Sequence, residues 1–302
     1  MSVDTQAPAL PQAPTRRRRH HANRKSTVLS IVMWMLAAYF LLPIAWLVIS
    51  STKNNDDLFT TFGLWFGNGL HLFDNLAKVF SVTNGIYVRW AMNTVLYAVV
   101  SAVGASLLAT MAGYAFAKYD FPFKRVMFST VLGAIMIPMT ALAIPTYLLF
   151  ANAGLTNTIW AVIVPSLVSP FGVFLMQTYA SEAIPDSLLE AARVDGAGEG
   201  TIFWRVSLRM LGPGVITVLL FNLVATWNNY FLPLIMLSTS ELYPLTVGLA
   251  QQQSAATAGS GAQALFSTVI TGSMVAILPL IVAFLFLQRY WESGLATGAV
   301  KE

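Results

Sequence analysis

Six apolar stretches dominate this sequence, and each is longer than the roughly 20 residues that cross about 30 Å of hydrocarbon as a helix. They occupy residues 28–50, 91–117, 126–150, 158–180, 211–237 and 265–288. A chain of 302 residues that is 56% hydrophobic and 10% charged cannot fold as a soluble domain without exposing a very large apolar area. Because only helices satisfy their own backbone in lipid, the sequence predicts an all-α integral membrane protein with six transmembrane helices.

The basic residues predict the orientation of the chain, since lysine and arginine are retained on the cytoplasmic side of a membrane. Of the 17 lysines and arginines, only Lys53, Lys78 and Arg89 fall on the far side when the N-terminus is placed inside. Both termini and the polar loop at residues 181–210 are therefore expected in the cytoplasm.

Residues 1–27 contain nothing apolar enough to pack, and we expect a disordered, basic cytoplasmic tail there. The run Arg16–Arg19 could suit nucleic acid, but a topology anchor beside an apolar span explains it fully, and no nucleic-acid partner is expected. A cleaved signal peptide is not expected, because the first apolar run is too long and lacks a clear small-residue cleavage site. The six spans form one transmembrane domain over residues 28–290, followed by a cytoplasmic C-terminal tail at 291–302.

The predicted spans contain no Asp, Glu, Lys, Arg or His, which disfavours transport driven by a proton or ion gradient. The three histidines lie outside the spans and cysteine is absent, so no catalytic residue, metal site or cofactor is expected. No Gly-Lys-Ser/Thr motif occurs, and Gly196, Gly198 and Gly200 follow a predicted helix instead of a strand. These glycines indicate helix termination, so ATP would have to be bound by a partner protein.

The second apolar stretch carries a stripe of small residues spaced four apart: Ser101, Ala105, Ala109, Gly113 and Ala117. On a helix these residues share one face, and their small side chains let another helix approach closely. The sequence leaves open whether that neighbour is another span of this chain or a partner subunit. Prolines within the spans are expected to leave kinks that can line a cavity.

The loop at residues 181–210 carries a first helix signal that opens after Pro185. Ser187 stands three residues before Glu190, which is the spacing of a capping box, so the Glu190 carboxylate could simply cap its own helix. Such a cap would be stabilising by roughly 1 kcal/mol or less and needs no partner. A second interpretation is that Ala191 and Ala192, with Leu188 and Asp195 at helical spacing, form a low-profile face that fits a groove on another protein.

Gly196 is expected to end this helix in a left-handed conformation, and a second amphipathic piece follows at residues 201–210. Its apolar side is formed by Ile202, Phe203 and Val206, with Arg205 and Arg209 opposite. A rigid helical knob between two spans is what a lever requires, because a floppy loop would absorb the movement of a docked partner.

The run Glu190–Ala197, followed by Phe203 and Leu208, resembles the short signature of the membrane-spanning subunits of ATP-binding cassette importers. In that family the loop docks into a cleft on the ATPase subunit, where its glutamate pairs with basic residues. The resemblance implies that this chain is coupled to an ATPase through five residues: Glu190, Ala191, Ala192, Asp195 and Gly196. Arg209 stands where the family usually has a proline, so the break after this helix is expected at Gly212 and Pro213.

The likeness continues through most of the chain after the tail and is strongest to the carbohydrate branch, whose maltose-transporter type has six-span membrane subunits. It is carried by Asn157, Thr158 and Pro165, by Trp227–Tyr230 with Pro233 and Leu234, by Tyr243–Leu245 with Val247–Leu249, and by Gln288–Tyr290 with Gly294, Leu295 and Gly298–Lys301. It implies a type I importer permease fold in a bacterial plasma (inner) membrane. The implied partners, besides membrane lipid, are a second permease in a heterodimer, a dimer of ATPase subunits, an extracytoplasmic solute-binding protein and a carbohydrate.

Trp227, Asn228, Asn229 and Tyr230 combine planar aromatic surface with side chains that both donate and accept hydrogen bonds, which sugar recognition requires. We assign them to the substrate path. The alternative is that the aromatic residues are interface anchors and the amides bond neighbouring helices.

The interpretation that we adopt is a permease subunit of a carbohydrate importer that is not itself an enzyme. Two other classes of protein remain as alternatives: a passive facilitator or channel that works alone, and a membrane scaffold with no transport path. The loop from about Ser51 to Trp90 would help to meet the solute-binding protein by resemblance, and a solvated loop is the default interpretation of its residues.

Overall fold

The computed structural model describes residues 27–258 and 266–296, and the regular structure within them is entirely helical. The tail predicted at residues 1–27 lies almost wholly outside these ranges, as does the last part of the tail predicted at 291–302. The chain divides into two units, residues 1–44 and 45–302, and each is described by itself.

The first unit contains most of helix α1 (Thr27–Ser51), which has Pro43 inside it. The side chains of this helix are apolar and open to their surroundings, with Trp34 77% exposed and Tyr39 71% exposed. A helix that is apolar on all sides requires lipid or another protein around it.

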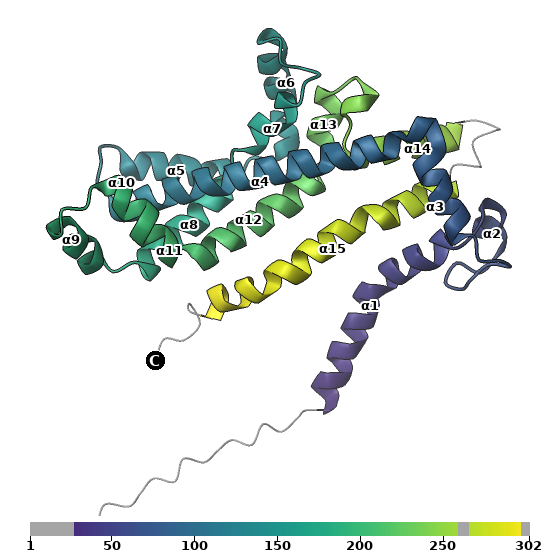
Figure 1. The fold of residues 1–302 in the computed structure, drawn as a ribbon, viewed down its shortest axis with the longest axis horizontal. Coiled ribbons are helices and arrows are strands. Elements are labelled where there is room, and N and C mark those ends of the chain that lie inside the picture. The colour runs from purple at the N-terminus through teal and green to yellow at the C-terminus, as the bar shows by residue number, and fades with distance from the viewer. Residues whose placement is uncertain (1–26, 259–265, 297–302) are drawn as a thin grey trace, which may run out of the picture. The chain divides into compact units, whose positions relative to one another are not determined.

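The second unit is built around the long helix α4 (Ile86–Lys118), which packs against α8 (Pro170–Ala183) and α12 (Gly212–Trp227) (Figure 1). The predicted stripe of small residues lies at this packing, and a Cβ atom on Gly113 would lie only 2.6 Å from the Cβ atom of Met176. Because the two helix backbones approach this closely, only glycine fits there. The neighbour that the sequence left open is therefore a helix of the same chain.

The stretch expected to be a continuous span at residues 126–150 is broken in the structure. It consists of α5 (Lys124–Ile135), the 3₁₀ turn η2 (Met139–Leu142) and α6 (Ala143–Asn152), and the two halves are bent by 102°. Pro138 lies at the break, where it lacks an N–H donor and disfavours helical conformation in the residue before it.

Two further expected spans are also interrupted. The span at 158–180 contains α7 (Trp160–Ser166) and then α8, which begins at Pro170 with Ser169 as its N-cap. The span at 211–237 contains α12 and the short helix α13 (Phe231–Met236), which are separated at residues 228–230. By length and composition, four stretches of the described chain could cross a membrane, and six if two bent helix pairs each count as one span.

The remaining elements of the second unit begin directly after α1 with α2 (Asn55–Thr60), α3 (Leu72–Ser81) and the 3₁₀ turn η1 (Val82–Gly85). The last part of the chain contains the 3₁₀ turn η4 (Ser240–Leu242), α14 (Leu245–Ala258) and α15 (Phe266–Ala296). The segment that resembles an outer loop of the importer family is thus largely helical, since α14 begins at Leu245. Helix α14 packs against both α4 and α15.

Two apolar clusters lie along α4. The cluster near its start includes Trp90 and Tyr97 together with residues of η4 and α14, and the cluster near its end includes Tyr114 and Met176. The second cluster also takes in side chains from the 181–210 loop. Helix α4 therefore connects that loop to the segment in front of α14.

Candidate functional site

The 181–210 loop begins with helix α9 (Asp186–Val194), and Gly196 ends it as predicted. Gly196 has a φ of 81°, its N–H donates to the Arg193 carbonyl, and the Ala197 N–H donates to the Ala192 carbonyl at 3.0 Å. These two bonds form a Schellman motif, which satisfies carbonyl groups that the helix end would leave free and which favours glycine at the left-handed position. The end of α9 is thereby sharply defined.

The capping box predicted between Ser187 and Glu190 is wrong. Pro185 stands at the N-cap in an extended conformation and no side chain caps the helix, so α9 begins two residues earlier than a cap at Ser187 would allow. Ser187 is consequently inside the helix. The Glu190 side chain is exposed and makes no hydrogen bond or ion pair with any residue that the structure describes, which leaves its carboxylate available.

Helix α9 has one buried side and one open side. Leu189 is 2% exposed and packs in the cluster near the end of α4, and the half-buried Ala192 packs against the same cluster. Ala192 therefore faces its own chain, whereas the other predicted coupling residues, Glu190, Ala191, Asp195 and Gly196, are exposed.

Val194 is an open-side residue that the sequence analysis missed. It is 87% exposed and follows Ser187, Glu190 and Ala191 at the i, i+3, i+4, i+7 spacing of one helix face. That spacing was available in the sequence. We call Ser187, Glu190, Ala191 and Val194 the open stripe of α9.

Polar contacts tie both ends of α9 to the end of α4. At the start of α9, Lys118 Nζ lies 2.8 Å from Asp186 Oδ1. At its end, Arg193 Nε lies 2.7 Å from Glu199 Oε1, and the Tyr119 hydroxyl donates to Glu199 Oε2 at 2.6 Å. Because Lys118 and Tyr119 are adjacent, both ends of α9 are held to one point of the molecule. We call these three contacts the α9 brace.

The brace shifts the ionisation of its members. Hydrogen bonding by Arg193, and then by Tyr119, lowers the pKa of Glu199, and Lys118 likewise lowers the pKa of Asp186. Burial, and then the hydrogen bond to Glu199, raises the pKa of the Tyr119 phenol. Carboxylates with lowered pKa values contribute stability that is fully present above their ordinary values and is lost only as the pH falls through the lowered values. The brace is therefore intact at neutral pH.

The second half of the loop contains the short helix α10 (Glu199–Thr201), a π-helical turn η3 (Ile202–Ser207) and the short helix α11 (Leu208–Met210). As predicted, Ile202 and Phe203 are buried and Arg205 and Arg209 are exposed. The chain then bends by 79° into α12, which has Pro213 in its first turn. The break thus lies at Leu211, directly before the predicted Gly212 and Pro213, which begin α12.

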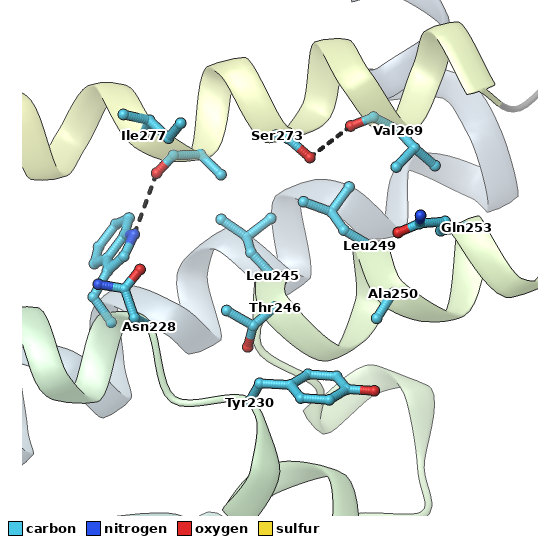
Figure 2. Close-up of a pocket in the computed structure, with 12 residues that line it drawn as sticks. Asn228, Tyr230, Leu245, Thr246, Leu249, Ala250, Gln253, Val269, Ser273 and Ile277 are labelled. Atoms are coloured by element: carbon cyan, nitrogen blue, oxygen red, sulfur yellow. Dashed lines mark hydrogen bonds between the residues drawn. The ribbon is translucent and has the colours of Figure 1, made fainter. Parts of the chain in front are cut away.

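A cavity of about 320 Å³ lies where the end of α12 meets α14 and α15 (Figure 2). Three of the four predicted substrate-path residues, Trp227, Asn228 and Tyr230, line it. Its other lining residues are Leu245, Thr246, Leu249, Ala250, Gln253, Val269, Ser273, Ala276 and Ile277. The cavity therefore combines two aromatic rings, aliphatic side chains and several polar groups.

Hydrogen bonds fix the walls of this cavity. Trp227 Nε1 donates to the Ala276 carbonyl at 3.2 Å, which ties α12 to α15, and the Thr246 hydroxyl donates to the Asn229 carbonyl at 2.8 Å, which ties the break after α12 to α14. Asn229 supports the wall through its backbone and is not among the lining residues. The exposed side chain of Gln253 lies one turn along α14 from Leu249 (Figure 2).

Sequence reasoning missed the cavity residues of α14 and α15. Gln253 and Ser273 are far from Trp227 along the chain, and no local pattern marks them. Among the described residues, no group of three or more His, Cys, Asp or Glu side chains could hold a metal ion. The cavity therefore offers amide, hydroxyl and aromatic contacts, which suit a neutral, hydroxyl-rich ligand.

Comparisons with known proteins agree on one family. A family model described as the binding-protein-dependent transport system inner membrane component matches residues 105–296. The arabinooligosaccharides transport system permease protein AraQ of Halalkalibacterium halodurans is 32% identical over 277 residues, which cover 91% of this chain and 96% of the relative. The lactose transport system permease protein LacG of Rhizobium radiobacter is 31% identical, over 88% of this chain and 93% of the relative.

A solved structure supports the same architecture. It belongs to a bacterial ABC transporter involved in the import of the acidic polysaccharide alginate, and one of its chains matches with a TM-score of 0.77 and 22% sequence identity. The match covers 87% of this chain and 95% of that chain. At this level of identity the likeness concerns the fold alone.

Proposed function

This chain belongs to the family of binding-protein-dependent transport system inner membrane components, and on that premise we propose that it is a permease subunit of an ATP-binding cassette importer of carbohydrates. A multi-pass membrane protein of this family is a transport subunit and not an enzyme. We propose as its partners a second, similar permease, a dimer of ATPase subunits and an extracytoplasmic solute-binding protein. The carbohydrate substrate is favoured by relatives that are named for arabinooligosaccharide and lactose transport.

The single observation that carries the coupling role is the open stripe of the braced helix α9. Glu190 and Val194 project from a helix whose ends are both held to α4, so a partner that grips the stripe would move α4 as well. We assign Glu190, Ala191, Asp195 and Gly196 to the contact with the ATPase. Ala192 is assigned to holding α9 against its own chain, where its small side chain is half-buried.

The cavity is the best-supported part of the substrate path. Aromatic rings stack on the apolar faces of sugars, and amide groups both donate to and accept from hydroxyl groups, so Trp227, Asn228 and Tyr230 form a suitable wall. Its volume of about 320 Å³ is at the lower end of the range for small-molecule sites, which is about 300–1,000 Å³. Asn229 is assigned to positioning this wall.

The proposed orientation follows from the distribution of positive charge, with both termini and α9 in the cytoplasm. The cavity at the end of α12 would then lie in the outer half of the membrane. ATP-driven closure of the partner ATPases would pull α9 and switch the path between inward-facing and outward-facing states.

Glu190→Ala tests the coupling role. We expect the variant to fold and to retain the second permease, but to lose ATPase subunits on purification in mild detergent and to lose carbohydrate uptake. Glu182→Ala, which removes another exposed carboxylate a few residues before α9, is the matched control and should behave as wild type.

Wild-type levels of both ATPase recovery and uptake in the Glu190→Ala variant would contradict the coupling role. If the wild-type chain purifies alone and moves substrate without ATP, the importer assignment itself is wrong and a passive facilitator replaces it.

A further inference from the structure

The segment between α1 and η1, residues 52–81, buries two of its charged side chains and exposes most of its large apolar side chains. Lys53 is 1% exposed and Asp57 is 3% exposed. In contrast, six aromatic or aliphatic side chains of the same segment are more than half exposed: Phe59, Phe62, Trp65, Phe66, Leu70 and Phe73, at 66%, 73%, 69%, 52%, 67% and 75%. A loop surrounded by water would show the reverse distribution.

The buried polar groups are used within the segment. Lys53 Nζ donates to the Phe62 carbonyl at 2.9 Å, and the Asp57 carboxylate accepts from the Asn68 backbone N–H at 3.1 Å and from Asn68 Nδ2 at 2.8 Å. Asn75 Nδ2 donates to the carbonyls of Ser51 and Lys53 at 2.9 and 2.8 Å. The segment is therefore a braced structure with a polar interior, and its aromatic side chains are held outward.

Part of this segment lies beside the last turns of α1, which belong to the same unit. The position that a Cβ atom on Gly63 would occupy is 3.7 Å from Trp46 Nε1. Trp46 precedes the end of α1 at Ser51 by five residues, which correspond to about 7 Å along a helix. Phe62 adjoins Gly63 and Trp65 follows two residues later, so both lie level with the end of a membrane-spanning helix and not beyond it.

We infer that residues 59–73 form a lipid-binding surface that inserts into the boundary between headgroups and acyl chains in the leaflet where α1 ends. At that depth an exposed aromatic side chain meets lipid, and indole and phenyl rings are favoured there because one part of the ring stays apolar while its edge meets polar groups. In the proposed orientation this is the outer leaflet.

The charges of the segment indicate the kind of lipid contact. The exposed charged side chains are Asp56, Asp74 and Lys78, which include both signs. Electrostatic attraction to anionic headgroups requires clustered basic residues, and none are clustered here. Insertion is therefore driven by apolar burial and does not depend on anionic lipid.

The absence of cysteine from the sequence permits a direct test. Single cysteines are introduced as Phe62→Cys, Trp65→Cys and Phe73→Cys, with Asp56→Cys as the water-facing control, and each is spin-labelled in phosphatidylcholine nanodiscs. At the three aromatic sites we expect the spin label to collide with oxygen several-fold more often than with a water-soluble nickel complex. At residue 56 we expect the label to collide more often with the nickel complex. Adding phosphatidylglycerol should leave the ratios unchanged.

Two outcomes would overturn the inference. High nickel access at the aromatic sites would place them in water. Low access to both reagents would show that protein covers them, such as the second permease or the solute-binding protein. The labels are read in the chain itself without ATP, ATPase or substrate, so failure of the importer assignment would leave this measurement unaffected. Equally, failure of the lipid-binding inference would leave the importer assignment unaffected.

Discussion

At the residue scale, the α9 brace is the feature that would let α9 transmit movement to α4, because an unbraced surface loop would absorb that movement. Exposed ion pairs usually contribute only about 0.2–1 kcal/mol, so the brace would add little to the stability of the whole chain. Lys118 differs from a surface lysine because its side chain is only 5% exposed, whereas its partner Asp186 is 79% exposed. Its ammonium group is held in place by α4, and its role is to fix the position of α9.

Charge reversal separates this positioning role from general stability. Lys118→Glu should repel Asp186 and free the start of α9. The ATPase would still bind the open stripe, but the freed α9 would absorb its movement. Carbohydrate uptake per ATP hydrolysed should therefore fall. The double variant Lys118→Glu with Asp186→Lys restores opposite charges and should recover much of the wild-type ratio of carbohydrate uptake to ATP hydrolysis. Arg125→Glu, which reverses an exposed basic residue at the start of α5, is the control. Equal loss in the single and double variants would show that the pair does not position α9.

At the element scale, the contact between α4 and α8 is set by the small-residue stripe. Gly113→Ala would place a methyl group 2.6 Å from Met176 Cβ and 2.8 Å from the Met176 carbonyl carbon, and backbone cannot move aside as a flexible side chain can. Overpacking of this kind costs about 1–3 kcal/mol. The thermal unfolding midpoint of the purified chain in detergent should fall.

Gly133→Ala is the matched control for that substitution. Gly133 lies inside α5, and a Cβ atom there would meet nothing within 4 Å. Removing a helical glycine without a clash should leave the midpoint unchanged or raise it, since glycine is less favourable than alanine in a helix by about 0.5–1 kcal/mol. Equal midpoints for the two variants would contradict the close approach at Gly113.

The elements also show what the sequence could and could not predict. Hydrophobic length identified the apolar stretches, and the spacing of small residues identified the packing face of α4, because both depend on local composition. The breaks inside the expected spans were not placed, although prolines in the spans were noted, because whether Pro138 kinks or divides a helix depends on the neighbours that replace its lost hydrogen bond. The start of α9 after Pro185 was predicted correctly, but the capping pattern at Ser187 was wrong, since the extended Pro185 itself occupies the N-cap.

The candidate site likewise contains residues that the sequence could predict and residues that it could not. The residues proposed to dock the ATPase form one short continuous segment, so a local signature sufficed to propose them. Asn228 and Tyr230 were found because they adjoin Trp227, whereas Gln253 and Ser273 reach the cavity from α14 and α15. No rule of local sequence states which helices will meet, and long-range packing supplied these residues.

At the scale of the whole molecule, α4 joins the two proposed sites. Its end carries Lys118 and leads directly into Tyr119, so it holds α9, while its first turns hold the segment in front of α14. Trp90 Nε1 donates to the Ser240 carbonyl at 2.8 Å, and Asn93 Nδ2 donates to the carbonyls of Glu241 and Tyr243 at 2.7 and 3.0 Å. That segment continues into α14, which forms one wall of the cavity. A helix of 33 residues spans about 50 Å, so this one helix connects the proposed docking site to the proposed substrate cavity.

Asn93→Leu tests this connection, because leucine keeps the approximate volume but removes the side-chain donor to the carbonyl of the buried Tyr243. The Glu241 carbonyl loses Asn93 as well but still accepts from Arg89 Nε at 3.3 Å. An unpaired buried group costs about 1–3 kcal/mol, enough to release residues 241–243 from α4 without unfolding a membrane domain held by two apolar clusters. The ATPase should still co-purify, since α9 is untouched, while carbohydrate uptake falls and ATP hydrolysis continues. Asn152→Leu, on the exposed side of α6, is the control. If Asn93→Leu lost the ATPase together with uptake, the defect would be in folding; if uptake were unchanged, α4 would not be the element that carries movement from α9 to the cavity.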